Sequence, residues 1–373
     1  MKKVLLGAFL VTSVTAGSVA QRSTPNPFAP APHSFPSPSP LLYVCNQNDA
    51  SVSILDAATL KLVRIVDLKP LGFSANAKPH HIVVEPDGSF WYVTLIGDNK
   101  IVKLDRNDRV VAQVTFETPG MMALHPSQDL LFVGRSMTAV NPPPRIGVVR
   151  RSDLKLEEID VLFPRPHAMV IEPKNGIVYT ASLAVNQMAA VDPSTERVEL
   201  TQVAGPAHAL MQFTVSPDGN TLAVSAELSA RVLLFDITER MKPKLVAVLD
   251  VERQPFDPMF SPDGRWVVLG NKAANAVTII DARQRKVAAV VRGQGLAQPH
   301  GIAISADSRT AFVTNNNLKG TGEHAGHTMV GGSEGTPAAP AGPGTVVAIN
   351  LTTQRIAQVI EVGHNASGIA ITR

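Results

Sequence analysis

The sequence predicts an all-β fold, a seven-bladed β-propeller built from four-stranded blades. Three observations predict it. Two strand-like runs each recur seven times, most copies lie about 45 residues apart, and the two chain ends hold complementary parts of one repeat. A period of 40–45 residues with four strands per unit is typical of propeller blades.

One recurring run is apolar and usually ends in aspartate. Its copies are VSILD ending at Asp56, IVKLD at Asp105, IGVVR at Arg150, MAAVD at Asp192, VLLFD at Asp236, VTIID at Asp281 and VVAIN at Asn350. Successive copies are 49, 45, 42, 44, 45 and 69 residues apart. The last step is long because one loop carries an insert.

A second run precedes each of these: LYVCN, WYVTL, LFVGR, VYTAS, LAVSA, VVLGN and FVTNN. Valine, tyrosine, phenylalanine and threonine favour strands. A further apolar strand precedes most copies, and Pro-Asp-Gly turns beginning at Pro86, Pro217 and Pro262 join it to the second run. These turns are expected to be structural.

The two chain ends predict how the ring closes. The C-terminal HNASGIAITR matches a first strand, whereas the N-terminal LLYVCNQNDASVSILD lacks one. We therefore expect both ends to build one shared blade, which pairs strand edges that an open array would leave exposed.

The runs WYVTL, FVTNN and LYVCN, each followed by an apolar run, resemble the YVTN-repeat (YncE-like) propeller family. The resemblance extends from about Leu41 to Arg373 and implies the fold. The family includes binding and surface proteins, and its relatives include lactonase-type and copper-containing propellers. No catalytic set of those enzymes matches this sequence, so no catalytic residue is assigned.

The chain divides into three segments. Residues 1–20 predict a secretory signal, with MKK, a short apolar core and the small residues Ser18-Val19-Ala20. Residues 21–40 form a Pro/Ser-rich linker, and residues 41–373 form the propeller. We expect a secreted or periplasmic protein with no transmembrane segment in the mature chain.

Charge and cysteine content narrow the classes of partner. Without Lys2 and Lys3 the formal net charge of +3 falls by two, to +1, so no nucleic-acid partner is expected. Cys45 is the single cysteine and is expected to be a buried, inert thiol. We expect a monomer.

The start of each first strand is the predicted ligand-binding region. Innermost strands line the central channel, so their first residues should gather at one mouth. The polar residues there are His80, His81, His167, His208, Asp257, His300 and His364. His80, His167 and His300 hold the same place in their repeats.

The insert, at about 317–344, is the candidate metal site. It carries His324, His327 and Met329 in a Gly-rich loop, and imidazole and thioether ligands suit copper or zinc. It joins a second strand to a third, so it should lie at the same mouth, where His80, His167 and His300 would complete the ligand set. The alternative is a tolerated surface loop.

Two functions follow. The favoured one is a non-enzymatic binding module that takes a small ligand, a metal ion or a protein partner at the mouth. The alternative is a periplasmic enzyme, copper-type or lactonase-like, that uses the same mouth. No cofactor is certain; copper and zinc are the candidates.

Overall fold

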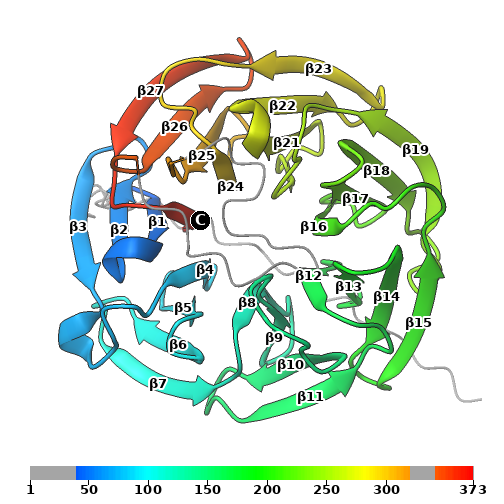
Figure 1. Cartoon of the computed structure of the whole chain (residues 1–373), viewed down its shortest axis with the longest axis horizontal. Coiled ribbons are helices and arrows are strands. Elements are labelled where there is room, and N and C mark those ends of the chain that lie inside the picture. The colour runs from blue at the N-terminus through cyan, green and yellow to red at the C-terminus, as the bar shows by residue number, and fades with distance from the viewer. Residues whose placement is uncertain (1–38, 320–340, 373) are drawn as a thin grey trace, which may run out of the picture. The chain divides into compact units, whose positions relative to one another are not determined.

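The computed structural model describes residues 39–319 and 341–372, which form seven four-stranded antiparallel sheets around a ring (Figure 1). The predicted seven-bladed propeller is confirmed. The predicted signal segment, nearly all of the linker and residues 320–340 of the insert lie outside the described residues. We name the blades A to G in chain order.

The strands of each blade follow one another from the channel outward. Blade A contains β28 (Ala366–Ile371), β1 (Leu41–Asn46), β2 (Ser51–Asp56) and β3 (Leu62–Asp67). Blade B contains β4 (Pro79–Val84), β5 (Phe90–Leu95), β6 (Lys100–Asp105) and β7 (Val110–Thr115). Blade C contains β8 (Pro119–Leu124), β9 (Leu130–Arg135), β10 (Arg145–Arg150) and β11 (Leu156–Asp160).

The remaining blades repeat this order. Blade D contains β12 (Pro166–Ile171), β13 (Val178–Ser182), β14 (Gln187–Asp192) and β15 (Arg197–Gln202). Blade E contains β16 (Leu210–Val215), β17 (Thr221–Ala226), β18 (Arg231–Asp236) and β19 (Lys244–Asp250). Blade F contains β20 (Met259–Phe260), β21 (Trp266–Asn271), β22 (Ala276–Asp281) and β23 (Lys286–Val291). Blade G contains β24 (Pro299–Ile304), β25 (Thr310–Asn315), β26 (Thr345–Asn350) and β27 (Arg355–Glu361).

Burial explains why the recurring runs are continuous rather than alternating. The middle strands of each blade are covered on both faces by neighbouring blades, so β1, β5 and β21 are buried along nearly their whole length. The outermost strands face solvent on one side, and β7 alternates between half-buried and exposed residues. Strands buried on both faces are expected to read as apolar runs.

The ring closes in blade A, as predicted. Strand β28 pairs antiparallel with β1, with Leu42 opposite Ile371. The Leu41 N–H donates to Thr372 Oγ1 at 2.8 Å, and the Thr372 N–H donates to the Leu41 carbonyl at 3.0 Å. Cys45, at the centre of this blade, is buried as predicted, and burial raises the pKa of its thiol.

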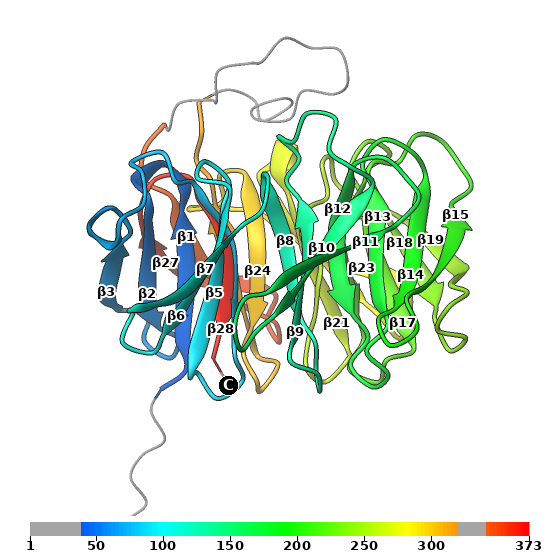
Figure 2. The same cartoon turned by 90° about the horizontal axis from the view of Figure 1, so that it is seen from below.

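The insert begins and ends on the face where the first strands start, as predicted. Asn315 pairs with Pro299 at the start of β24, and Thr345 pairs with Asn315. The Leu318 N–H then donates to Gln298 Oε1 at 3.0 Å. The side view in Figure 2 shows the C-terminus at the face opposite to this one. We call the face where the first strands start the mouth face.

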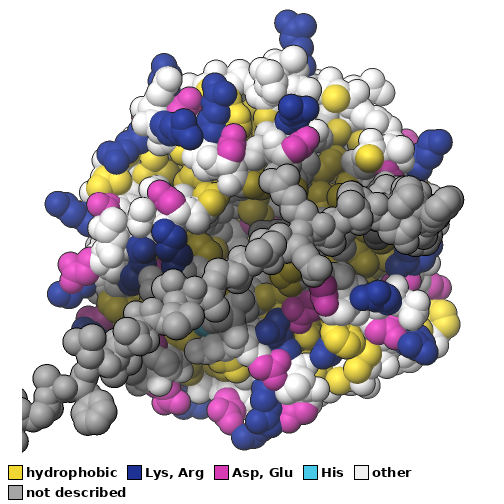
Figure 3. All heavy atoms as spheres, turned by 180° about the vertical axis from the view of Figure 1, so that it is seen from behind, with side chains coloured by type: hydrophobic (Ala, Val, Ile, Leu, Met, Phe, Trp, Pro, Cys, Tyr) yellow, Lys and Arg dark blue, Asp and Glu magenta, His cyan; other side chains and the backbone are white. Residues whose placement is uncertain are grey.

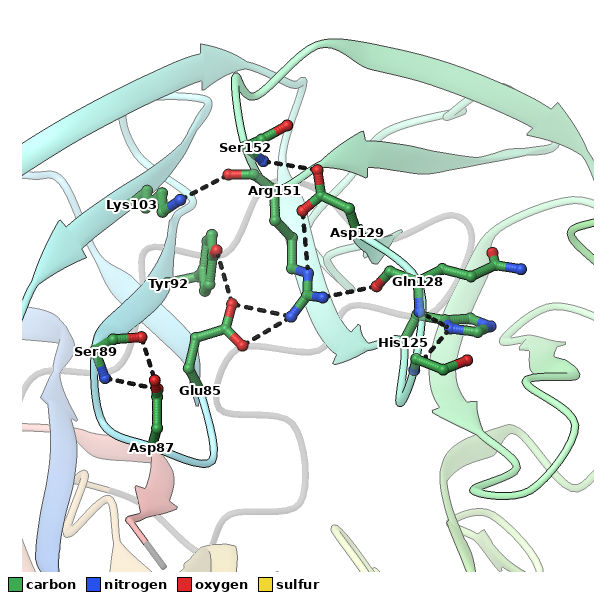
Figure 4. Close-up of polar contacts among 11 residues, drawn as sticks. Glu85, Asp87, Ser89, Tyr92, Lys103, His125, Gln128, Asp129, Arg151 and Ser152 are labelled. Atoms are coloured by element: carbon green, nitrogen blue, oxygen red, sulfur yellow. Dashed lines mark hydrogen bonds and ion pairs between the residues drawn. The ribbon is translucent and has the colours of Figure 1, made fainter.

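Ion pairs join neighbouring blades near the opposite face. Between blades B and C, Arg151 donates to both oxygens of Glu85, at 2.7 and 3.0 Å, and also to the Gln128 carbonyl (Figure 4). The Tyr92 hydroxyl donates to Glu85, and Lys103 Nζ donates to the Arg151 carbonyl. We call this the Glu85–Arg151 clamp.

Blades D and E carry the same device. Glu172 holds the place of Glu85, is fully buried, and lies 3.8 Å from Arg240 Nε. The Tyr179 hydroxyl donates to the Arg240 carbonyl at 2.7 Å. Within the described ranges no helix is long and apolar enough to cross a membrane.

Candidate functional site

One residue of each blade occupies what we call the mouth position, at the start of the first strand. It directly follows the first-strand residue that pairs with the last residue of the second strand. These pairs are Ala366 with Asn46, Pro79 with Leu95, Pro119 with Arg135, Pro166 with Ser182, Leu210 with Ala226, Pro255 with Asn271 and Pro299 with Asn315. From blade A to blade G, the residues at the mouth position are Ser367, His80, Gly120, His167, Met211, Phe256 and His300.

A bulge gives this position its orientation. In six blades the first strand shifts register immediately after the paired residue. A bulge leaves a backbone group without a ladder partner and turns the nearby side chains. In blade B the second-strand Thr94 repairs this, because its hydroxyl accepts from the His81 N–H at 3.0 Å and donates to the Gly120 carbonyl at 3.1 Å. Thr314 accepts from Gly301 in the same way in blade G.

In each blade, the residue immediately before the first-strand member of this pair has a left-handed backbone. We call its place the left-handed position. Its φ lies between 42° and 57° in all seven blades. Its carbonyl accepts a hydrogen bond from the residue after the second strand, which we call the loop position. The residues at the left-handed position are Asn365, Lys78, Thr118, Arg165, Ala209, Gln254 and Gln298. The loop position holds Gln47, Ile96, Ser136, Leu183, Glu227, Lys272 and Asn316.

Side chains from blades B, F and G contact one another at the mouth. The rings of His80 and His300 meet edge to face, with centroids 5.6 Å apart. The His300 ring also lies 4.5 Å from the ring of Phe256, and Lys272 Nζ lies 4.9 Å from the Phe256 centroid. Blades B and G are separated in the ring by blade A, so the first contact joins two blades that are not neighbours.

Hydrogen bonds determine which ring nitrogen of three histidines carries the proton. An amide nitrogen and a backbone N–H can only donate, so His80 Nδ1 accepts from Gln47 Nε2 and His81 Nδ1 accepts from the Met122 N–H. In the neutral ring Nε2 of each then carries the proton. His167 is the reverse, because its Nδ1 donates to the Arg135 carbonyl at 2.8 Å. Its Nε2 is therefore an acceptor.

These three imidazoles are neutral at physiological pH. Burial lowers the pKa of His80 to about 3, with further lowering by His81, His167 and Lys272. Burial also lowers the pKa of His81 and of His167 to about 4. The charge of Arg165 adds to the effect on His167. The histidines of blades B and D thus lie close enough for their charges to interact.

The charged groups of blades E and F are also perturbed by burial. Burial raises the pKa of Asp257 to about 7, although the Ile302 backbone N–H favours its ionised form. Burial lowers the pKa of Lys272 to about 8, while attraction to Glu227 opposes this shift. Buried titratable groups with shifted pKa values are typical of functional sites.

Two predicted site residues are held apart from this group. His208 Nδ1 bonds Ser229 Oγ at 2.8 Å and its Nε2 donates to the Ala204 carbonyl at 3.1 Å, so both nitrogens have local partners. His364 Nδ1 lies 3.0 Å from Asp49 Oδ1, at the closure of blade A. A ligand-binding role for either stays a prediction.

The predicted metal ligands of the insert, His324, His327 and Met329, lie outside the described residues. Among residues 39–319 and 341–372, no three His, Cys, Asp or Glu side chains come together as metal ligands.

Three residues of the mouth were not predicted from the sequence: Phe256, Lys272 and Gln47. Alignment of the seven repeats on their turns would have placed Phe256 at the position of His80. No comparable signal marks Lys272 and Gln47, because the loops that carry them differ in sequence and only the shared backbone hydrogen bond relates them.

The surface outside the mouth carries charges of both signs. On the face turned away from the viewer in Figure 1, Lys and Arg side chains alternate with Asp and Glu around the rim (Figure 3). Arg145 forms an ion pair with Asp160, and Arg150 forms one with Asp153. This mixed pattern differs from the single-signed surface that nucleic acid requires.

Comparison with known proteins identifies the fold. No family model and no curated protein matches the chain. A functionally unknown protein from Desulfotomaculum acetoxidans is similar in structure, with a TM-score of 0.69 and 14% identity over 89% of this chain and 99% of that one.

Two proteins of stated function are also similar in structure. A streptogramin B lyase has a TM-score of 0.59 and 14% identity, over 78% of this chain and 84% of its own. The dihydro-heme d1 dehydrogenase NirN, in complex with DHE, has a TM-score of 0.57 and 18% identity, over 90% of this chain and 75% of its own. Such low identities establish the propeller fold alone.

Proposed function

We propose that this chain is a secreted bacterial binding module that holds a ligand at the mouth of its propeller. The observation that carries the proposal is the meeting of buried polar side chains from separate blades, above all the His80–His300 contact at 5.6 Å. Buried titratable side chains from several blades that gather at one channel mouth favour a role in binding.

The chemistry at the mouth supports binding rather than catalysis. The imidazoles of His80, His81 and His167 have pKa values of about 3 to 4, far from the range in which a histidine exchanges protons at neutral pH. Neutral rings on rigid strands are suited to hydrogen bonding. The lactonase-like alternative would need an acid–base pair, for which Asp257, with its pKa near 7, is the strongest candidate.

The test is a thermal-shift screen of the secreted chain against organic acids, sugars, amino acids and nucleosides. The key variant is His80→Ser, which gives blade B the residue that blade A carries as Ser367. The control is Arg150→Gln, an exposed residue near the opposite face. We expect at least one compound class to stabilise the parent and the control but not the His80 variant. Equal stabilisation of all three, or of none, would refute the proposal.

The metal-binding alternative rests on where the insert is fastened. Asn317 Nδ2 donates to the Pro343 carbonyl at 2.8 Å, and the Ala341 N–H donates to the Asn317 carbonyl at 2.8 Å. Both ends of the insert are thereby held at the mouth face. Metal content of untagged protein grown with copper and zinc would test it. About one equivalent, lost in the His324→Ala/His327→Ala variant, would favour this function.

We also propose membership of the YVTN-repeat family. The support is that the threonine of that motif has a defined task here. Thr94 and Thr314 satisfy the backbone at the bulge beside the mouth position. The threonine of the sequence motif thus has a structural role next to the proposed binding face.

A further inference from the structure

The mouth has an apolar side, formed by blades C, D and E. Leu183, Met211 and Phe256 pack in one cluster, with Met137 against it. Large hydrophobic side chains are also exposed on loops of the mouth face in the same blades. These are Val140, Leu162, Val185 and Leu228, which are 73%, 63%, 41% and 48% exposed. Exposed apolar side chains on the loops of one face are a feature of binding surfaces.

The other side of the mouth, formed by blades F, G, A and B, is rich in hydrogen-bond donors. Nε2 of His80 carries a proton and has no hydrogen-bond partner among the described residues. Lys272 adds an ammonium group, which also interacts with Glu227. His80 is only 8% exposed and Lys272 only 5%, so both residues are buried.

Phe256 connects the two sides. It belongs to the apolar cluster with Leu183 and Met211, yet its ring also lies 4.5 Å from His300 and 4.9 Å from Lys272 Nζ. A ligand lying on Phe256 would meet apolar side chains in one direction and donors in the other.

The hydrogen-bond donors of the mouth favour an anionic head on that ligand. Lys272 and Arg165 are cationic, and Arg165 forms no ion pair in the described part of the chain, where its Nη2 donates to the Met137 carbonyl. Glu227 opposes Lys272, and Asp257 is the other nearby acid. The Lys272 ammonium and the Nε2–H of His80 are N–H donors, and such donors select a head with oxygen acceptors.

From these contacts we infer that the ligand is an amphipathic carboxylate. Its apolar body packs on Phe256, Met211 and Leu183, and its carboxylate accepts hydrogen bonds from Lys272 Nζ and His80 Nε2–H. This inference rests on the proposed function and specifies the class of molecule bound.

The test compares 2-naphthoate with its neutral isostere 2-naphthamide, and with acetate, by titration calorimetry on the full chain. The parent should bind naphthoate at least tenfold more tightly than naphthamide, and acetate more weakly than either. Hydrogen bonds to a charged group support a difference of this size.

Each of two variants receives the residue that another blade carries at its loop position, and both should therefore fold. Lys272→Gln copies Gln47 and should remove the preference for naphthoate over naphthamide. Leu183→Asn copies Asn316 and should weaken both compounds about equally. Circular dichroism and the unfolding midpoint establish folding for each variant.

The outcomes separate the two proposals. Equal affinity for acid and amide, or a preference that survives Lys272→Gln, would overturn the inference while leaving a binding mouth. The inference would also be overturned, and the binding mouth retained, if naphthoate did not bind while another compound class stabilised the parent but not the His80→Ser variant. No binding by these probes or by any compound of the wider screen would overturn both.

Discussion

At the scale of single residues, the mouth contains left-handed backbone conformations and neutral histidines that an unfolded chain would not favour at acid pH. All seven left-handed positions are occupied by residues other than glycine. Thr118 is the least suited of them, because a β-branched residue at φ 42° is an outlier. Its Oγ1 is also buried without a hydrogen-bond partner in the part of the chain described.

Replacing Thr118 with glycine should therefore stabilise the protein. Relief of backbone strain should outweigh the entropy of glycine and raise the free energy of unfolding by about 1 kcal/mol. Urea denaturation would measure it. Thr115→Gly, three residues earlier in strand β7, is the control and should lower the same quantity. A loss of stability at Thr118 equal to that at Thr115 would show that the left-handed position is not strained.

The mouth histidines should make the protein sensitive to acid. His80, His81 and His167 have folded-state pKa values of about 3 to 4, below the value of 6.5 for a free imidazole. The unfolded chain therefore binds more protons than the native state between pH 6.5 and 4, and stability falls as the pH is lowered through that window. Above pH 6.5 these three groups contribute no pH dependence.

His80→Ser removes one of those groups. On going from pH 7.5 to pH 5, the variant should lose less stability than the parent, by on the order of 1–2 kcal/mol. Urea midpoints at both pH values measure the difference. If parent and variant lose the same amount, the His80 ring is protonated in the folded state and the tautomer assigned above is wrong.

At the scale of elements, neighbouring blades are joined at both faces by different means. On the mouth face, hydroxyl and backbone groups meet across blades, as where Thr94 donates to the Gly120 carbonyl. Near the other face, the Glu85–Arg151 clamp and the Glu172–Arg240 pair join blades B to C and D to E. Polar contacts thus set the spacing of blades whose broad faces pack through apolar side chains.

Arg151→Met tests the clamp. Among the described residues, the change leaves the largely buried Glu85 carboxylate with one hydrogen-bond partner, the Tyr92 hydroxyl. It should lower the free energy of unfolding by roughly 1–3 kcal/mol. The neighbouring Arg150→Met breaks only an exposed pair with Asp153 and should cost less than about 1 kcal/mol. Chemical denaturation compares the two. Similar losses would mean that the clamp adds nothing beyond a surface ion pair.

At the scale of the whole molecule, the ring depends on a strand supplied by the chain's end. Blade A takes β28 from the C-terminus and its other three strands from the N-terminus. Strand β28 also lies against β24 and β4 of the two adjacent blades, so it forms part of the channel wall as well as of its own sheet. Without it, an edge of β1 and the sides of two blades would be exposed.

Deletion of residues 366–373 should therefore abolish cooperative thermal unfolding followed by circular dichroism. Open sheet edges also favour aggregation, which light scattering would detect. A synthetic peptide of residues 364–373 added in trans should restore part of the transition. A truncated chain that unfolds as cooperatively as the parent would show that ring closure is not required.

Much of this protein was determined by its sequence alone. The period near 45 residues, the apolar runs and the incomplete repeats at the two ends specify blade number, strand order and closure, because these depend on local patterns repeated along the chain. The same patterns predicted that His80, His167 and His300 lie at one mouth.

The composition of the mouth was decided only by the tertiary structure. Whether His80 meets His300, whether Lys272 reaches Phe256, and which nitrogen of each imidazole is protonated depend on contacts between blades far apart in sequence. His208 shows the same dependence, since the nearby Ser229 and Ala204 hold both of its nitrogens. The sequence repeat predicts the position of a residue within its own blade. The side chain that it contacts can belong to another blade, whose loop sequence is different, so the repeat does not predict that contact.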